Sequence, residues 1–240
     1  VLRSFFAHQR SDGSVPARLF ADHRADVGVA QAAWGEAILA LDTVWPDDDF
    51  LREMYAPLSR YADWLLLARD AESSGMIDIA GPREIGERHS SRFEAVEGRL
   101  KGIDVTTYAH TLLRALESMA HRAGQPADAR RWRVARERIE RAVREHMWDE
   151  ADEMFSDVDA RSGERTRVKT AHAFYPYATE LAGAAGVPGL ERHLLDPAEF
   201  WTPFPVPVTS VDEPFFTAYG DWKGQRADEP CIGPDRADLV

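Results

Sequence analysis

Apolar residues recur at helical spacing through the middle of the chain. From Asp104 onward they occupy Val105, Tyr108, Ala109, Leu112, Leu113, Leu116, Met119 and Ala120. This i, i+3, i+4 pattern places them on one face of an amphipathic helix. Asp104 suits the N-cap, because its carboxylate can accept a hydrogen bond from a free first-turn N–H. Gly124 suits the end of the helix.

A second stripe follows almost at once. It comprises Trp132, Ala135, Ile139, Ala142, Val143 and Met147, with charged residues on the opposite face. Pro126 fits the first turn of this helix, where a missing N–H costs nothing. Because the turn between the two predicted helices is so short, we expect an antiparallel helical hairpin.

An earlier pair of stripes predicts a second hairpin. Its helices cover residues 30–44 and 51–68, and Pro57 is expected either to kink the second helix or to mark its start. Shorter helices are predicted at 170–182, interrupted near a proline, and at 190–195. We therefore predict an all-α fold.

Long loops separate the predicted helices. They cover residues 71–100, 150–168 and 197–216, and the last is rich in proline and aromatic residues. Loops longer than about 12–15 residues in a compact domain are usually functional. The middle loop suits a turn or short hairpin, but no run predicts a strong strand. No motif recurs at a fixed period, which argues against a repeat solenoid. Helical hairpins without a strict repeat can also close into a toroid.

Composition narrows the function classes. The chain has 240 residues, 41 Asp and Glu against 29 Lys and Arg, and a formal charge of −12. This acidic balance argues against a nucleic-acid partner, which needs a basic face. No apolar run approaches a membrane span, so no membrane partner and a soluble protein are expected. The single cysteine, Cys231, excludes an internal disulfide framework and fits a cytoplasmic location.

No motif for a metal or an organic cofactor is present, so neither is expected. One acidic loop offers an alternative. Asp152, Asp157 and Asp159, together with Glu153, resemble a calcium loop but lack EF-hand spacing. A solvated turn is the preferred interpretation of these residues.

The densest chemistry lies in residues 84–93. The segment reads Glu84-Ile-Gly-Glu87-Arg88-His89-Ser90-Ser91-Arg92-Phe93. It brings carboxylates, guanidiniums, an imidazole and hydroxyls together in a predicted loop, where binding residues concentrate. A solvated charged loop is the alternative interpretation.

This segment resembles the E-S-G-W-D-F-S-S-R-W motif of trehalases and the E-S-G-x-D motif of glycoside hydrolase family 63. The residues in register are Glu84, Gly86, Ser90, Ser91, Arg92 and Phe93. Other stretches resemble segments of the same clan in the same order. They are Asp12-Gly13-Ser14-Val15-Pro16, Gln31-Ala-Ala-Trp34, Trp64 to Asp70, Phe200 to Pro207 and Gly220 to Gly224.

The resemblance implies an (α/α)6 toroid that hydrolyses an α-glucosidic or α-mannosidic bond with inversion. It covers residues 1–224 as a partial domain and leaves 225–240 as a divergent tail. Since only five or six helices are predicted and a closed toroid has twelve, we expect an incomplete toroid. Unpaired apolar helix faces would then promote self-association.

The resemblance places the family's general acid on Arg88. Arginine stays charged near neutrality and cannot act as an acid, so Glu87 is the candidate and Glu84 the less favoured substitute. An inverting enzyme also needs a second carboxylate roughly 6.5–9.5 Å away to activate water. In the family this base lies downstream of the region that resembles it here, so we expect no base in this chain.

The expected partner is an oligosaccharide or a small glycoside. Aromatic platforms and hydroxyl contacts are expected from Trp34, Arg69, Asp70, Arg88, Arg92, Trp201, Phe204 and Trp222. A core position is the alternative for any one tryptophan, because tryptophan is usually largely buried. Two other functions stay open: a non-catalytic carbohydrate-binding or scaffold protein of the same fold, and a helical-repeat interaction protein. The aromatic–proline segment at 200–207 argues against the latter, whose turns are short.

Overall fold

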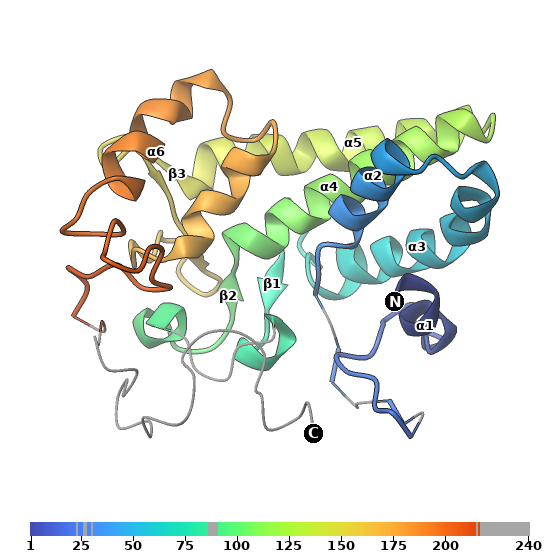
Figure 1. Ribbon diagram of the computed structural model, residues 1–240, viewed down its shortest axis with the longest axis horizontal. Helices are drawn as coiled ribbons and strands as arrows, with labels where there is room; N and C mark the ends of the chain where they lie inside the picture. The colour runs from blue at the N-terminus through green and yellow to red at the C-terminus, as the bar shows by residue number, and fades with distance from the viewer. Residues whose placement is uncertain (23, 26–27, 30, 86–90, 215, 217–240) are drawn as a thin grey trace. The chain divides into compact units, whose positions relative to one another are not determined.

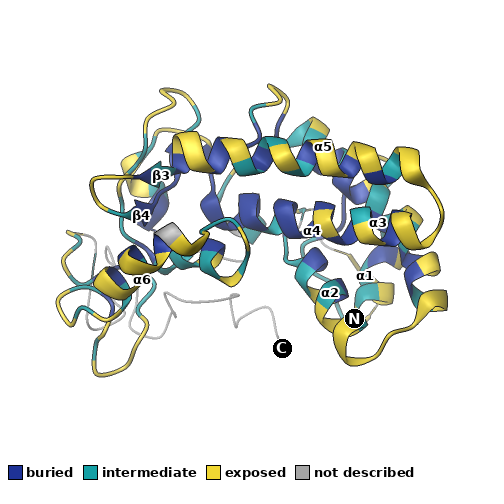
Figure 2. Ribbon diagram, turned by 90° about the horizontal axis from the view of Figure 1, so that it is seen from above, coloured by how far each residue is buried: buried dark blue, intermediate teal, exposed yellow. Residues whose placement is uncertain are grey.

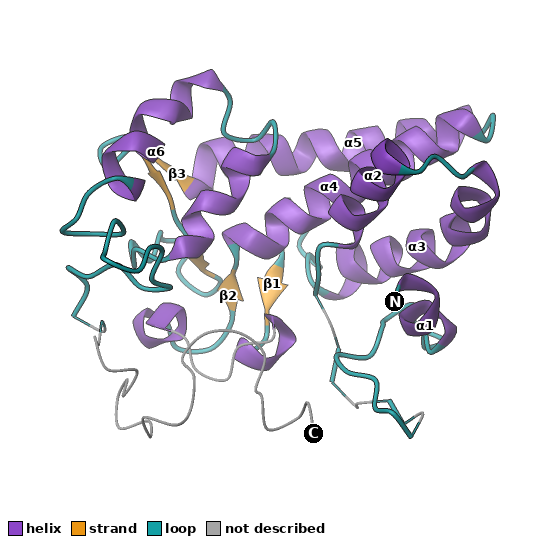
Figure 3. Cartoon of the chain, viewed as in Figure 1, coloured by secondary structure: helices purple, strands orange, loops and turns teal. Residues whose placement is uncertain are grey.

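The computed structural model is predominantly helical (Figure 3). The described residues are 1–22, 24–25, 28–29, 31–85, 91–214 and 216. They pack as two compact units: unit 1 holds residues 1–77 and 105–142, and unit 2 holds residues 78–104 and those after 142. Within this described part, no helix combines the length and apolar character that crossing a membrane requires.

Unit 1 is built from helices (Figure 1). They are α1 (Leu2–Ala7), α2 (Trp34–Val44), α3 (Asp48–Ala68), α4 (Ile103–Arg122) and α5 (Pro126–Ala142), and the first two residues of α4 belong to unit 2. Helices α4 and α5 form the predicted antiparallel hairpin (Figure 1). Gly124 ends α4 with a φ of 68°, in the left-handed region that favours glycine. Helix α4 starts at Ile103, two residues before the start predicted from an Asp104 N-cap, so Asp104 lies inside its first turn.

The predicted stripes of α3, α4 and α5 are the buried faces of these helices, whereas Leu41 and Val44 of the stripe predicted for α2 are exposed. Figure 2 shows the buried face running along α4 and a narrower one along α5, whose outer face is exposed. Trp132 of α5 is completely buried. Its indole N–H donates to the Tyr55 hydroxyl of α3 at 3.2 Å, and that hydroxyl donates to Asp128 at 2.9 Å. Helices α3 and α5 are therefore joined by hydrogen bonds as well as by apolar packing.

Helix α3 runs through Pro57. It begins at Asp48, and the carboxylate of Asp47 caps it by accepting the Phe50 N–H at 2.9 Å. Pro57 therefore lies inside the helix and does not mark its start. An aspartate cap and two further acidic residues in the first turn complement the N-terminal end of the helix dipole.

Gly35, in the first turn of α2, packs directly on α4. A Cβ atom built at this position would lie 2.2 Å from the backbone nitrogen of Leu112. We expect Gly35→Ala to lower the free energy of unfolding by about 1–3 kcal/mol, because the two backbones must separate. Urea denaturation measures the change. Gly81→Ala is the matched control, since a Cβ there meets nothing within 4 Å. Equal stability of the two variants would contradict this contact.

Unit 2 contains short strands that the sequence did not predict. β1 (Asp78–Ile79), β2 (Leu100–Lys101) and β5 (Val158–Asp159) form an antiparallel sheet in the order β1-β2-β5, and β3 (Trp148–Asp149) pairs with β4 (Met154–Phe155). Each strand has 2 residues, which is too short for an alternating pattern to be recognised. The expected short hairpin at 150–168 corresponds to the β3–β4 and β5 region.

The helical elements of unit 2 are mostly short. They are η1 (Pro82–Ile85), η2 (Ser91–Ala95), the π turn η3 (Val143–Met147), η4 (Ala171–Ala178), η5 (Ala184–Gly186) and α6 (Val187–Leu194). The helix predicted at 170–182 is the 3-10 helix η4 and contains Pro176. The one predicted at 190–195 is α6, which begins at Val187. Phe200 is completely buried in unit 2, and its ring centroid lies 4.8 Å from that of Phe174 in η4.

Tyr177 of η4 makes unit 2 sensitive to alkali. Burial, with a smaller contribution from the Glu153 charge, raises the pKa of Tyr177 to about 12 from 10.0. The folded state therefore holds this proton when the unfolded state has lost it. The stability from the neutral phenol is complete below pH 10 and is lost as the pH rises toward 12.

Between pH 10 and 12 the free energy of unfolding of the unmodified chain should fall as this proton is lost. We expect that fall to be smaller by about 1–2 kcal/mol in Tyr177→Phe. Urea unfolding below pH 10 and between pH 10 and 12 measures it. Tyr175→Phe, at an exposed position of the same helix, is the control. An equal alkaline loss in Tyr177→Phe and the unmodified chain would contradict the assignment.

Candidate functional site

The structure describes residues 84–85 and 91–93 of the motif segment 84–93. Residues 86–90, which include the predicted acid Glu87 and its neighbour Arg88, lie outside the described residues. Before them, Glu84 sits in η1 and its Oε2 atom accepts the Ala80 N–H at 3.0 Å. The Glu84 N–H donates to the Gly81 carbonyl at 3.1 Å. Glu84 therefore belongs to a tight local turn after β1.

Arg92, in η2, lies at the centre of a buried ionic cluster. Its side chain is 0% exposed. Nη1 and Nη2 donate to the Asp104 carboxylate at 3.0 and 2.6 Å, and Nε and Nη2 donate to Asp157 at 2.7 and 2.8 Å. Burial opposes the charge, but the two carboxylates more than offset it and hold the pKa of Arg92 well above its usual value. The guanidinium is thus a permanent cation between two carboxylates.

Gly102 has no side chain, and this leaves room for the Arg92 cluster. A Cβ there would lie 2.4 Å from Ile79 Cδ1, 2.8 Å from Asp104 Oδ1 and 3.0 Å from Arg92 Nη2. Asp157 also accepts the Ile103 N–H at 2.9 Å. Three parts of unit 2 therefore meet at the Arg92 cluster. They are η2, the start of α4, and the residues just before β5.

A second ionic pair lies in the adjoining sheet. Asp78 of β1 faces Lys101 of β2 across the strand pair, and both are buried. Lys101 Nζ donates to Asp78 Oδ1 at 3.1 Å, and Arg99 Nη1 lies 2.8 Å from Asp78 Oδ2. Asp78 therefore pairs with two cations at the β1–β2 strand pair.

The motif segment is also joined to the loop at 197–216, which contains the aromatic–proline segment. The Ser91 and Thr209 hydroxyl oxygens are 2.7 Å apart, and Thr209 forms a β-bridge with Thr170. In the same segment Trp201 is 49% exposed and Phe204 is 91% exposed. Both side chains are therefore accessible to solvent. The third predicted platform of this region, Trp222, lies outside the described residues.

The predicted site residues of unit 1 have local partners. Trp34 is buried, and its ring centroid lies 5.4 Å from Phe5 and 5.5 Å from Phe6. Arg69 lies over the Trp64 ring, 5.1 Å from its centroid.

The Asp70 carboxylate fixes the loop after α3 by accepting two backbone hydrogen bonds. Its Oδ1 accepts the Ser74 N–H at 2.6 Å and its Oδ2 accepts the Gly75 N–H at 2.9 Å. Arg138 Nη2 lies 3.8 Å from the same carboxylate. Asp70 is therefore a buried structural group within unit 1.

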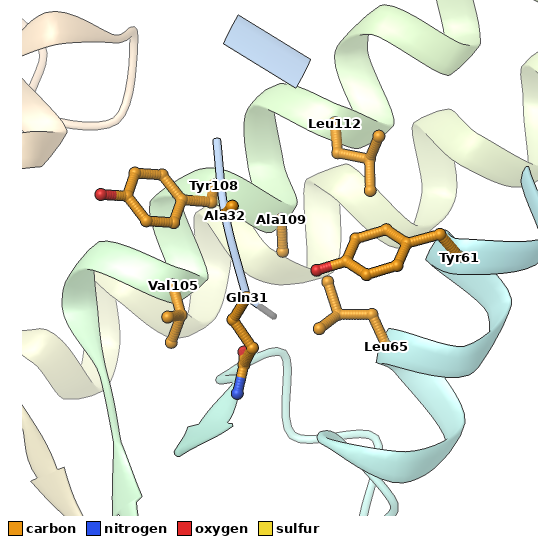
Figure 4. Close-up of a pocket in the computed structure, with 8 residues that line it drawn as sticks. All are labelled: Gln31, Ala32, Tyr61, Leu65, Val105, Tyr108, Ala109 and Leu112. Atoms are coloured by element: carbon orange, nitrogen blue, oxygen red, sulfur yellow. The ribbon is translucent and has the colours of Figure 1, made fainter. Parts of the chain in front are cut away.

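Unit 1 also has a narrow crevice (Figure 4). Gln31, Ala32, Tyr61, Leu65, Val105, Tyr108, Ala109 and Leu112 line it. The crevice places Gln31, from the segment Gln31-Ala-Ala-Trp34, beside Tyr61 and Tyr108. Neither tyrosine was predicted as a site residue. In this conformation the crevice is too narrow to admit a water molecule.

No cluster of three or more His, Cys, Asp or Glu side chains suited to a metal ion occurs among the described residues. The acidic loop considered for calcium has other partners. Asp157 binds Arg92, and Asp159 Oδ1 accepts the Arg161 N–H at 2.8 Å. These carboxylates serve the protein's own hydrogen bonds.

Sequence reasoning missed the partners of the motif segment. Asp104 and Asp157 receive the Arg92 guanidinium, and Thr209 contacts Ser91. A buried arginine requires carboxylate partners, but its sequence position does not show which ones.

Comparison with known proteins places these features in a class. The chain belongs to the family described as the mannosylglycerate hydrolase MGH1-like glycoside hydrolase domain, whose model matches residues 1–226. A search of curated proteins finds no match.

Solved structures from Thermus thermophilus share the fold. An uncharacterized conserved protein superposes with a TM-score of 0.79 at 17% identity, covering 90% of this chain and 67% of its own. A GH63 mannosylglycerate hydrolase in complex with glucose gives 0.78 at 18%, covering 90% and 68%. The same hydrolase in complex with Tris and D-glycerate gives 0.76 at 17%, covering 90% and 69%. The resemblance to glycoside hydrolase family 63 and the predicted all-α fold, an incomplete (α/α)6 toroid of helical hairpins, are confirmed.

Proposed function

We propose that this chain is part of a glycosidase that hydrolyses an α-glucosidic or α-mannosidic bond of an oligosaccharide or small glycoside with inversion, and that it supplies the acid and the sugar contacts but not the base. The family match over residues 1–226 supports a glycosidase. Structural relatives include a mannosylglycerate hydrolase in complex with glucose and with D-glycerate, which favours a small glycoside. The observation that carries the proposal is the Ser91–Thr209 contact of 2.7 Å. It joins the segment that contains the acid to the loop with exposed aromatic rings.

Glu87 is proposed as the general acid. Its neighbour Arg88 cannot release a proton near neutrality. The Glu84 carboxylate already accepts a backbone N–H in its own turn, which makes it the weaker substitute. Inversion requires a second carboxylate roughly 6.5–9.5 Å from the acid to activate water. We propose that this base lies outside residues 1–224, the part of the chain that resembles the family.

Sugar contacts are proposed for the exposed aromatic residues of unit 2. Trp201 and Phe204 offer their open ring faces as platforms, and Trp222 is proposed with them. Arg88 is proposed to bind a hydroxyl or a carboxylate of the substrate through its fork of N–H donors. For Trp34, Arg69 and Asp70 the local partners favour a supporting role in unit 1 over direct contact.

The proposal is tested by sugar release. A polypeptide that contains this chain together with the base is incubated with a panel of α-glucosides and α-mannosides that includes mannosylglycerate, and free glucose or mannose is quantified. We expect one member of the panel to be hydrolysed well above the rate without protein. A panel that yields no free sugar would contradict the proposal.

A second candidate is a carbohydrate-binding protein of the same fold without catalysis. Arg88 at the position of the family's acid is the observation that favours it. Calorimetry with the same glycosides distinguishes the two. Binding without turnover would support the second candidate, whereas turnover that Glu87→Gln abolishes would exclude it.

A further inference from the structure

We infer that His193 of α6 carries both ring protons in the folded chain and, as a cation, forms a pH-sensitive clamp on Glu199 at the start of the aromatic–proline segment. The clamp lies within unit 2 and outside the motif segment 84–93. The inference goes beyond the proposed function and does not depend on it, because it concerns how the loop that bears Trp201 is held.

The two ring nitrogens of the buried His193 both face oxygen acceptors. Nδ1 lies 2.6 Å from Glu199 Oε2, and Nε2 lies 2.6 Å from the backbone carbonyl oxygen of Asp152. A neutral imidazole has one N–H and one bare nitrogen, so it can donate to only one of these oxygens. The bare nitrogen would then direct its lone pair at the lone pairs of the other oxygen. If Glu199 is ionised, only the imidazolium donates at both positions, and bonds from an ionised donor are short.

Lys169 favours the ionised form of Glu199. Its Nζ donates to Glu199 Oε1 at 2.7 Å and also to the Asp212 carboxylate. Burial opposes the charge of Lys169, but its bonds to these two carboxylates raise its pKa overall. A proton on Glu199 would weaken its bond with Lys169, so a neutral Glu199 that donates to His193 is disfavoured. A charged His193 also balances the cluster, because Lys169 and His193 then face the carboxylates of Glu199 and Asp212.

Other titratable groups lie on α6 and on the elements packed around it. They are Glu191 and Arg192 of α6, His172, Tyr175 and Tyr177 of η4, Asp152 and Glu153 before β4, and Asp196 and Glu213 in the loops that follow. Arg192 Nη1 lies 3.5 Å from Glu153 Oε2, so these two charges pair with each other. Burial raises the pKa of Tyr177 to about 12, which keeps its phenol neutral where histidine titrates. Glu199 and the Asp152 carbonyl are the groups that bond to the His193 ring.

The clamp joins α6, the turn between β3 and β4, and the start of the aromatic–proline segment. The Glu199 carbonyl accepts the Val211 N–H at 3.0 Å, and the Trp201 N–H donates to the Asp196 carbonyl at 2.9 Å. Loss of one His193 proton leaves a bare nitrogen against an oxygen, so one of the two ring contacts must open. The folded chain binds this proton more tightly than the unfolded chain. The stabilisation is therefore complete below about pH 6.5 and is lost as the pH rises.

Nitrogen NMR of the unmodified chain tests the protonation directly. Long-range correlation spectra of the isotopically labelled protein distinguish an imidazolium, whose two nitrogens have similar shifts, from a neutral ring, whose bare nitrogen lies far downfield. His193→Gln identifies the His193 signals among those of the 8 histidines. At about pH 7.5 an unperturbed imidazole is roughly nine-tenths neutral. We expect the His193 ring to remain an imidazolium at that pH.

Hydrogen exchange of the Val211 and Trp201 amides measures how firmly the clamp holds. After correction for the intrinsic pH dependence of exchange, we expect their protection to fall about tenfold between about pH 6 and about pH 9. Glu199→Gln is the decisive variant. Its amide N–H can donate to Nδ1 of a neutral His193 while its amide oxygen still accepts from Lys169. Since a neutral ring then fits both partners, the protection should lose its pH dependence.

His146→Gln is the matched control, because His146 is an exposed histidine of the same unit. It should retain the tenfold pH dependence of the unmodified chain. If His193→Gln fails to fold, Glu199→Gln identifies the ring signals instead, since it alters the group bonded to Nδ1.

Either of two results would overturn the inference. One is a neutral His193 ring at about pH 7.5 in the unmodified chain. The other is the same pH dependence of amide protection in Glu199→Gln as in the unmodified chain. Neither measurement requires sugar hydrolysis, so failure of the proposed function would leave both readouts intact.

Discussion

Replacing Glu87 with glutamine is expected to lower kcat for the hydrolysed glycoside by about 10²–10⁴-fold, with little effect on KM. Glutamine preserves the size and polarity of the side chain but carries no proton to donate to the leaving oxygen. Sugar binding therefore persists while bond cleavage slows. Steady-state rates over a range of glycoside concentrations separate kcat from KM.

A glycoside whose leaving group needs no proton is the control for the Glu87→Gln prediction. An aryl glycoside with an acidic phenol leaves with little need for a proton, so Glu87→Gln should slow its hydrolysis far less. Glu97→Gln is the matched variant, since the Glu97 side chain is 85% exposed and pairs only at the surface with Arg161. Full activity of Glu87→Gln would reject the assignment, and loss in Glu84→Gln instead would transfer the role to Glu84.

Replacing Arg92 with methionine is expected to lower the free energy of unfolding by about 3–5 kcal/mol. The substitution leaves two buried carboxylates without the cation that both of them bind. Since whole domains are stabilised by only about 5–15 kcal/mol, the loss is a large share of the total. Urea denaturation of the variant and the unmodified chain measures it.

The network itself provides a further variant. Arg92→Met combined with Asp104→Asn and Asp157→Asn removes the unpaired charges and should recover part of the lost stability. Arg161→Met is the control, because its side chain is 75% exposed and such surface pairs contribute little. A loss in Arg92→Met no larger than that control would show that the buried cluster does not stabilise unit 2.

Helical periodicity predicted the parts of the fold that long stripes determine. The residues from Val105 to Ala120 are the buried face of α4, and Gly124 ends that helix as expected. Pro57 was more ambiguous from sequence, because proline can start a helix or interrupt it. Packing decides the outcome, and α3 extends back to the cap at Asp47.

The parts that depend on partners far along the chain could not be predicted. The strands of unit 2 are two residues long and exist because of their pairing, as in the match of Asp78 with Lys101. Arg92 was predicted near a sugar from its place in the motif. Its partner Asp157 is 65 residues away, a separation that no local pattern encodes.

The central claim is that the glycosidase to which this chain contributes cleaves an α-glycoside with inversion, and proton NMR of the first product tests it most directly. Spectra recorded as hydrolysis begins distinguish the α- and β-anomers of the released glucose or mannose. The account predicts that the β-anomer appears first and that the α-anomer follows only by mutarotation. An α-anomer released first, or no sugar released from any α-glucoside or α-mannoside, would contradict it.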